Sequence, residues 1–197
     1  MRAFLRLVPA AAALALLGTL PRGVAAQSAP AEPAAAPQHS PVYTQMRQEA
    51  LTGPPENLQF EGRRPRVWGS VMELGLASGR VATLVVFADG TTSLLSSAGG
   101  GIVGSGSQRT VRRASDEFLE EAAEAARGTA EAAESPLPGP GRVRFYLRTN
   151  GGLRTAEAGE DELKAGGHAL SELYAAGQAV LQQVRPLSSH EGAAPTP

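Results

Sequence analysis

The stretch from Asp89 to Ser107 constrains the fold of this 197-residue chain more than any other part of the sequence. It opens with Asp89-Gly90, a two-residue hairpin turn in which glycine tolerates the positive φ that the turn requires. A strand is predicted from Thr91 to Ser96, and after a run of glycines a helix begins near Gln108. A hairpin that leads through glycines into a helix indicates a domain that combines a sheet with helices.

Four further strands are predicted outside this stretch. Two precede it and two follow the Pro-rich run 135–140, which excludes regular structure. Asn150-Gly151 joins the last two strands in a second hairpin with one apolar face. Alternation or runs of β-branched residues place the four strands over residues 67–76, 81–88, 143–148 and 153–158.

Three segments have helical spacing. Residues 108–127 place apolar side chains on one stripe and end near Gly128. Residues 170–184 give the strongest helix signal, which Pro186 ends. A shorter helix over residues 43–51 has only a loose apolar face, so its docking stays open.

The element order β-β-β-α-β-β-α predicts an α+β fold. We expect a single domain over residues 42–186, with a five-stranded, largely antiparallel sheet and the helices packed on one face. Roughly 145 residues are enough to bury a core without covalent staples. The chain has no cysteine, so disulfides and thiolate metal sites are excluded.

The N-terminal segment predicts export, and both ends of the chain predict segments outside the domain. Residues 1–26 begin with basic residues, continue through an apolar run from Leu7 to Leu20 and end in small residues, which is typical of a secretory signal peptide. The run is too short for a membrane span, so no stable membrane insertion is expected after cleavage. Residues 27–41 predict a disordered Ala/Pro-rich tether and residues 187–197 a disordered tail. We therefore expect the domain in the periplasm or outside the cell.

The charge balance argues against a nucleic-acid partner. Removing the predicted signal peptide takes three of the 18 basic residues and leaves 15 against 19 acidic ones, a net charge of −4. A nucleic-acid-binding domain is expected to carry a basic excess. No group of side chains has metal-ligand spacing, so neither a metal nor a cofactor is expected.

Two strings near the glycines are near-matches to nucleotide-binding motifs. Gly99-x-Gly101-x-x-Gly104 has the dinucleotide spacing, but no second parallel strand with a ribose-binding acid follows about 20 residues later. The run from Asp89 to Ser93 resembles the phosphate-binding turn of sugar kinases and actin-like ATPases, but it lacks the residue between the aspartate and the glycine. A hairpin turn and a loop explain both strings better.

The glycine loop nevertheless offers a candidate site for a small anion. Its backbone amides, with arginines in the first turns of the following helix, have the chemistry to hold a phosphate. The alternative is that these arginines pair with Asp116 and Glu117 at three- and four-residue spacing. His168 is the one histidine near a helix start, where a loop contact is its commoner role. The candidate ligand-binding residues are Gly104, Ser105, Gly106, Ser107, Arg109, Arg112 and His168, and no catalytic residue is identified.

Two groups of large side chains are assigned from their pattern alone. Trp68 and Phe118 are predicted to belong to the core. A set of arginines in the second hairpin is interpreted as a solvated open face. That set is Arg142, Arg144, Arg148 and Arg154.

Several motifs together resemble a family of small bacterial α+β proteins of unknown activity. They are Val67-Trp68-Gly69, the run from Asp89 to Ser93, Gly99-Gly100-Gly101-x-x-Gly104-x-Gly106, Val111-Arg112, Phe145-Tyr146-Leu147 and His168-x-Leu170-Ser171. The resemblance covers roughly residues 67–185 and departs from the family at Gln108 and Leu95, where members often have a histidine and an aromatic residue. The strand and helix order is also similar to that of roadblock and profilin-like domains, which are interaction or sensor modules.

The sequence favours a non-catalytic exported domain that binds a partner protein or a small ligand. No Gly-x-Ser-x-Gly elbow or Ser-x-x-Lys pair is present, and no acid stands at motif spacing from a histidine. One alternative is an anion-binding or weakly hydrolytic protein that uses loop 99–107. Another is a structural module of the cell envelope.

Overall fold

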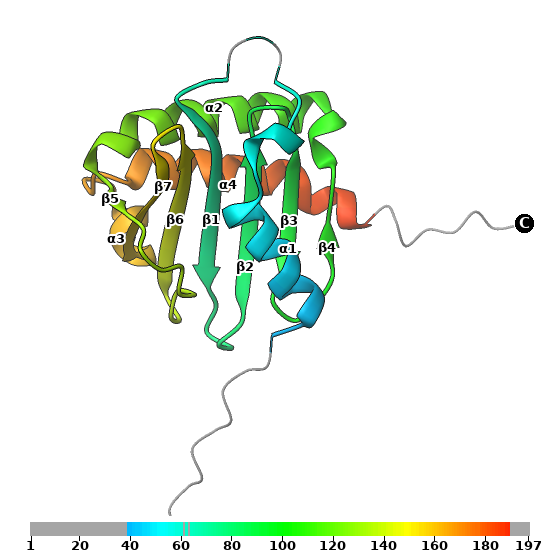
Figure 1. Cartoon of the computed structure of the whole chain (residues 1–197). Coiled ribbons are helices and arrows are strands. Elements are labelled where there is room, and N and C mark those ends of the chain that lie inside the picture. Colours follow the sequence, from blue (N-terminus) through cyan, green and yellow to red (C-terminus); the bar gives the residue numbers. More distant parts are fainter. Residues whose placement is uncertain (1–38, 61, 63, 190–197) are drawn as a thin grey trace, which may run out of the picture. The chain divides into compact units, whose positions relative to one another are not determined.

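One antiparallel sheet of seven strands forms the centre of the domain (Figure 1). The computed structural model describes residues 39–60, 62 and 64–189, which all lie in one compact unit, Ala35–Pro197. The strands lie in the order β4-β3-β2-β1-β6-β7-β5. Their bounds are β1 (Val67–Gly75), β2 (Val81–Phe87), β3 (Thr92–Ser96), β4 (Gly101–Ile102), β5 (Ala130–Glu131), β6 (Arg142–Thr149) and β7 (Gly152–Gly159).

The described residues also form four α-helices and four short 3₁₀ turns. The α-helices are α1 (Pro41–Thr52), α2 (Arg109–Ala125), α3 (Glu160–Ala165) and α4 (Ser171–Val184). The 3₁₀ turns are η1 (Pro55–Asn57), η2 (Ser105–Ser107), η3 (Ala126–Gly128) and η4 (Arg185–Ser189).

The predicted α+β class and the five predicted strands are confirmed, but the predicted strand count was too low. The structure adds β4 and β5, edge strands of two residues each that pair with β3 and β7. Two residues are too few to show alternation, so such strands leave no periodic signal in the sequence. The sequence prediction also missed α3, whose six residues lie between β7 and α4.

The larger core lies between the sheet and the helices α2 and α4. Met72, Phe145 and Leu84 point to this face from adjacent strands, and Phe118 of α2 is fully buried among them. Gly177 of α4 is required by the packing, because a Cβ there would overlap the side chain of Met72 and crowd Phe118. The predicted core position of Phe118 is confirmed.

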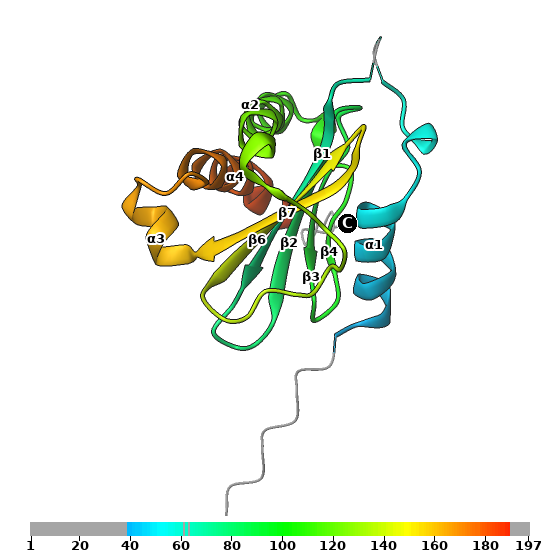
Figure 2. The same cartoon turned by 60° about the vertical axis from the view of Figure 1, so that its left-hand side comes forward.

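Helix α1 lies on the opposite face of the sheet, so the prediction that the helices share one face was wrong. Figure 2 shows α2 and α4 on one side of the strands and α1 on the other. A second apolar cluster forms beneath α1, where Tyr43 and Leu51 pack on Val71 and Val85. The weak apolar face of α1 did not predict on which side of the sheet the helix packs, because many of the contacts between α1 and the sheet are polar.

The Pro-rich segment 135–140 has no regular structure, as predicted, and its carbonyl oxygens accept hydrogen bonds from side chains of α1 and β6. The Ser135 carbonyl oxygen accepts a hydrogen bond from Arg47 Nη2 at 2.9 Å, and that of Pro136 accepts one from the Tyr146 hydroxyl at 2.6 Å. Gly75 allows the segment to approach β1, since a Cβ at this position would overlap the carbonyl oxygen of Gly139.

The predictions for the two chain ends fall mostly outside the described residues. The signal peptide and all but residues 39–41 of the tether belong to the part that is not described, and α1 already begins at Pro41. At the other end, η4 extends to Ser189, two residues beyond the predicted start of the tail at Leu187. Among the described residues, no helix has the length and apolar character to cross a bilayer.

Candidate functional site

The glycine loop is held by close packing against the preceding hairpin. Gly104 has a φ of 73°, in the left-handed region that favours glycine. Gly106 is buried, and a Cβ there would overlap the carbonyl oxygen of Gly90. Ser105 donates a hydrogen bond from its hydroxyl to the Thr92 carbonyl oxygen at 3.0 Å. These contacts show that the backbone conformation and packing of the loop require Gly104, Ser105 and Gly106. Ser107 is exposed at the end of η2.

The arginines after the loop pair with carboxylates of their own helix, as the alternative interpretation predicted. Arg112 Nε lies 3.2 Å from Asp116 Oδ1, and Arg113 Nε lies 3.1 Å from Glu117 Oε1. Both pairs have four-residue spacing, and both are exposed enough to contribute little stability. Arg109 is exposed at the first position of α2.

His168 lies far from the glycine loop. It is exposed, and its Nδ1 accepts a hydrogen bond from the Leu170 amide at 3.1 Å at the start of α4. The turn η4 at the other end of α4 contacts β4, next to the loop. A helix of 14 residues spans about 20 Å. The structure therefore brings Gly104, Ser105, Gly106, Ser107, Arg109 and Arg112 into one region of the fold and leaves His168 outside it.

A buried ion pair that the sequence analysis missed attaches α1 to the sheet. Arg47 Nε lies 2.5 Å from Glu73 Oε1, and Arg47 Nη2 lies 2.9 Å from Glu73 Oε2. Glu73 is 0% exposed, and its neighbour Thr83 accepts or donates a 2.9 Å hydrogen bond with the Tyr43 hydroxyl. Burial raises the pKa of Glu73, while the Arg47 guanidinium acts in the opposite direction. Because Glu73 is fully buried and both of its carboxylate oxygens accept hydrogen bonds from Arg47, we interpret the pair as structural.

Each of the three tyrosines in the chain has a raised phenol pKa. Burial raises the pKa of Tyr43 to about 12, and the nearby Glu73 carboxylate adds to this effect. Burial also raises the pKa of Tyr174 to about 12, with a contribution from its 3.0 Å hydrogen bond to Glu160. Burial likewise raises the pKa of Tyr146. The folded domain therefore favours the neutral form of all three phenols.

We expect alkaline titration to show this preference. A phenol whose pKa is higher in the folded than in the unfolded state stabilises the fold fully below its ordinary pKa of 10.0, and the contribution is lost as the pH rises towards 12. Ultraviolet absorbance of the folded protein should show little phenolate at the ordinary pKa of tyrosine, and ionisation at higher pH together with unfolding. Urea-unfolded protein should ionise at the ordinary value. Stepwise ionisation of the folded protein near that value would contradict the assignment.

The second hairpin is not the solvated basic face that the sequence suggested. Arg148 is buried, lies 4.3 Å above the Trp68 ring and donates hydrogen bonds to the carbonyl oxygens of Ala50 and Gly53. It thereby satisfies carbonyl groups at the end of α1. Arg142 and Arg144 both pair with Glu157 of the adjacent strand.

Arg154 lies on the other face of the sheet from these three arginines. It stands opposite Leu147, a residue of the larger core, and cross-strand partners share a face. Its Nε donates to the carbonyl oxygen of Ala126 at 3.1 Å, at the end of α2. Alternation along a single strand predicts faces correctly only when the register of the partner strand is known.

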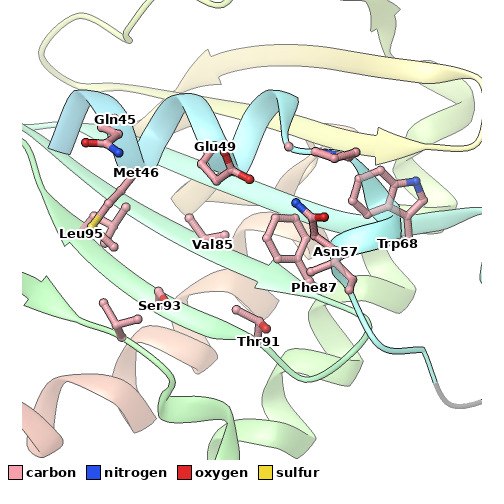
Figure 3. Close-up of a pocket in the computed structure, with 15 residues that line it drawn as sticks. Gln45, Met46, Glu49, Asn57, Trp68, Val85, Phe87, Thr91, Ser93 and Leu95 are labelled. Carbon is pink, nitrogen blue, oxygen red and sulfur yellow. The ribbon is translucent and has the colours of Figure 1, made fainter. Parts of the chain in front are cut away.

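The position of α1 creates an apolar groove between this helix and the outer part of the sheet (Figure 3). Val85, Phe87 and Leu95 from β2 and β3 form the floor, while Met46 of α1 contributes to the wall. The groove has a volume of about 470 Å³. That volume lies within the range of small-molecule sites in proteins.

Five of the described side chains that line the groove are polar, namely Gln45, Glu49, Asn57, Thr91 and Ser93. Asn57 of η1 lies near the Trp68 end, and the hydroxyls of Thr91 and Ser93 lie along β3 and the turn before it. Among the described residues that line the groove, Glu49 is the one that carries a charge. Trp68 is 3% exposed, so its predicted core position is confirmed, although it also lines the groove, where its ring stacks on that of Phe87.

Exposed apolar side chains continue the groove towards the start of α1. Val42 is 62% exposed and Val103 is 64% exposed, and both line a smaller cavity of about 190 Å³ that shares Met46 and Leu95 with the groove. A third large apolar side chain of the described residues, Leu76, is exposed at the turn after β1. Two of the three large apolar side chains that are exposed among the described residues therefore lie beside α1. The sequence offered no indication of this surface, because its residues come from distant segments.

Among the described residues, no group of three histidine, cysteine, aspartate or glutamate side chains is placed to hold a metal ion. Comparison with family models, curated proteins and solved structures finds no match to this chain. The resemblance to the small bacterial α+β family and to roadblock and profilin-like domains therefore stays a prediction.

Proposed function

We propose that this protein is a non-catalytic exported binding module whose groove beside α1 takes a small apolar ligand. The observation that carries the proposal is the half-open groove of about 470 Å³, lined mostly by apolar side chains. Folded domains usually cover apolar surface of this kind unless it has a use. The predicted strand and helix order, similar to that of interaction modules, points in the same direction.

The volume of the groove favours a small molecule over a protein as the occupant. A stable protein interface buries about 800 Å² on each partner, with aromatic anchors at its centre. Here the aromatic residues Trp68 and Phe87 lie deep at one end, and only Val42 and Val103 extend the apolar surface outwards. A slender chain of methylene groups fits this shape, with its polar end near the rim.

Glu49 determines which polar end the groove accepts. It is the charged residue of the lining, and it lies on the wall formed by α1 (Figure 3). A carboxylate head group would be repelled by Glu49, whereas a hydroxyl or an ammonium would be accepted. At the exposed groove mouth one charge–charge contact contributes about 1 kcal/mol, which corresponds to about a fivefold change in affinity.

The emission of Trp68 provides the test, because the chain contains one tryptophan and it lines the groove. We expect octanol and octylamine to change this emission with a Kd on the order of 0.1 mM, since about seven buried methylenes contribute ~0.8 kcal/mol each. Octanoate should bind about fivefold more weakly. Glu49→Gln should remove that difference, whereas Glu56→Gln, an exposed acid outside the groove, should preserve it.

A second pair of variants tests the location. Val103→Asp places a charge at the exposed rim and should weaken binding of octanol and octanoate. Leu76→Asp places the same charge at another exposed apolar residue, away from the groove, and should leave binding unchanged. Equal effects of the two variants, or no emission change with any octyl compound, would refute the proposal. Binding of a protein instead of octyl compounds would replace the small-molecule occupant with an interface.

The alternative of an anion site on the glycine loop has weaker support. Arg112 is paired with Asp116, and His168 lies at the far end of α4 from the loop. The positive φ angles and the close backbone packing of the loop explain why glycine occurs at these positions, and neither requires a ligand.

A further inference from the structure

A second cavity lies around the β6–β7 turn, beside the start of β1. It has a volume of about 400 Å³. Unlike the groove beside α1, it is lined largely by cationic and polar side chains, and none of its described lining residues carries a carboxylate. The lining residues are Arg66, Ala126, Arg127, Thr149, Asn150, Gly151 and Arg154.

Three separate segments bring the three arginines to this cavity. Arg66 immediately precedes β1, and its carbonyl oxygen accepts a hydrogen bond from the Asn150 amide at 3.1 Å. Arg127 belongs to η3 at the end of α2, and Arg154 belongs to β7. The turn between β6 and β7 is itself fixed, because the Asn150 side chain donates to the Pro65 carbonyl oxygen at 3.3 Å. Two hydrogen bonds therefore join the β6–β7 turn to the segment before β1 on one side of the cavity.

Among the described residues, no carboxylate forms an ion pair with Arg66 or Arg154, although Glu131 stands opposite Arg154 in the adjacent strand. The Arg154 side chain donates to neutral acceptors, namely the carbonyl oxygens of Ala126 and Thr129 and the Thr129 hydroxyl. The Arg66 side chain makes no hydrogen bond or ion pair with the described residues. Arg127 pairs with Glu124 at 3.5 Å, but both side chains are more than two-thirds exposed, so the pair contributes little.

We propose that this cavity binds a compact oxyanion with two or more negative charges, of the phosphate or pyrophosphate class. Guanidinium groups present pairs of N–H donors that match the oxygen atoms of phosphate, and a cavity lined by one sign of charge concentrates the opposite one. An oxyanion would contact Arg66 and Arg127 at the open side and would relieve the repulsion between the arginines. This site is independent of the groove beside α1.

Calorimetric titration of the full chain with pyrophosphate, at constant ionic strength, tests the proposal. Arg66→Gln and Arg127→Gln change exposed side chains, so both variants should fold normally. Each should raise the Kd about tenfold, which is the effect of losing one charge-assisted hydrogen bond of about 1.4 kcal/mol. Inorganic phosphate should bind more weakly than pyrophosphate to the same residues.

Matched variants separate this cavity from other sites. Arg80→Gln removes one exposed positive charge at the opposite end of β1, and Val103→Asp alters the groove; both should leave the pyrophosphate Kd unchanged. An equal loss of affinity in Arg80→Gln would indicate general attraction to positive charge and would overturn the proposal. A loss in Arg109→Gln but not in Arg66→Gln would move the site to the glycine loop. No binding of pyrophosphate to the unmodified protein would also overturn it.

Discussion

Glu73→Ala is expected to lower the free energy of unfolding by about 3–5 kcal/mol, because it leaves the Arg47 guanidinium buried without its counter-charge. The Arg47 side chain retains its hydrogen bond to the Ser135 carbonyl oxygen, but a neutral carbonyl does not replace a carboxylate. Urea unfolding followed by circular dichroism measures the loss. A decrease below about 1 kcal/mol would show that the pair is not needed to hold α1.

The double variant Arg47→Met with Glu73→Met is the matched control. Apolar side chains of similar length remove both charges together, and replacing a complete buried ion pair in this way is often neutral or stabilising. We expect the double variant to unfold within about 1 kcal/mol of the unmodified protein, although either single variant is strongly destabilised. Additive losses in the cycle would mean that the two side chains do not act as a pair.

The same experiment connects stability with the proposed binding function. Helix α1 contributes Met46 and Glu49 to the groove, and Arg47 attaches that helix to β1 through Glu73. Loosening α1 by Glu73→Ala should therefore weaken octanol binding, whereas the double methionine variant should retain it. Retained binding in a destabilised Glu73→Ala protein would show that the groove does not depend on this attachment.

Phe118→Ala is expected to destabilise the domain by a comparable amount, about 3–5 kcal/mol, through the cavity that it leaves. Phe118 is 0% exposed and lies where α2, α4 and β1 meet, close to Gly177 and Met72. Close packing around the ring allows little collapse into the vacated space. Chemical unfolding at equilibrium measures the change.

Two comparisons test the origin of that loss. Val42→Ala removes an apolar side chain that is 62% exposed, and it should change stability by less than about 0.5 kcal/mol. Octanol should bind Phe118→Ala with an unchanged Kd under conditions where the variant is folded, because Phe118 and the groove lie on opposite faces of the sheet. A loss of groove binding in the folded variant would indicate coupling between the two faces.

The strands and long helices of this protein were predictable because their signals are local. Strand β2 was expected over 81–88 and covers Val81–Phe87, and α4 was expected over 170–184 and covers Ser171–Val184. Side-chain alternation and helical spacing are set by backbone geometry within one element. The Pro-rich segment 135–140 was equally recognisable, since proline removes backbone donors.

The candidate sites were not predictable in the same way. The groove combines α1, the start of β1 and residues of β2 and β3, and the arginine cavity combines Arg66, Arg127 and Arg154. No spacing along the chain relates these residues. The glycine loop attracted attention because its motif is contiguous, but its glycines meet the backbone requirements of a hairpin and a 3₁₀ turn.

Local sequence was therefore sufficient for the type, order and approximate bounds of the main elements, and for the α+β class. Tertiary structure alone decided the face on which α1 docks, because that choice depends on a buried Arg47–Glu73 pair and on Arg148 reaching the end of the helix. It also decided the two edge strands, the side on which Arg154 lies and the positions of both cavities. The physical reason is that backbone preferences act over a few neighbouring residues, whereas ion pairs, cross-strand register and cavities depend on which distant segments meet.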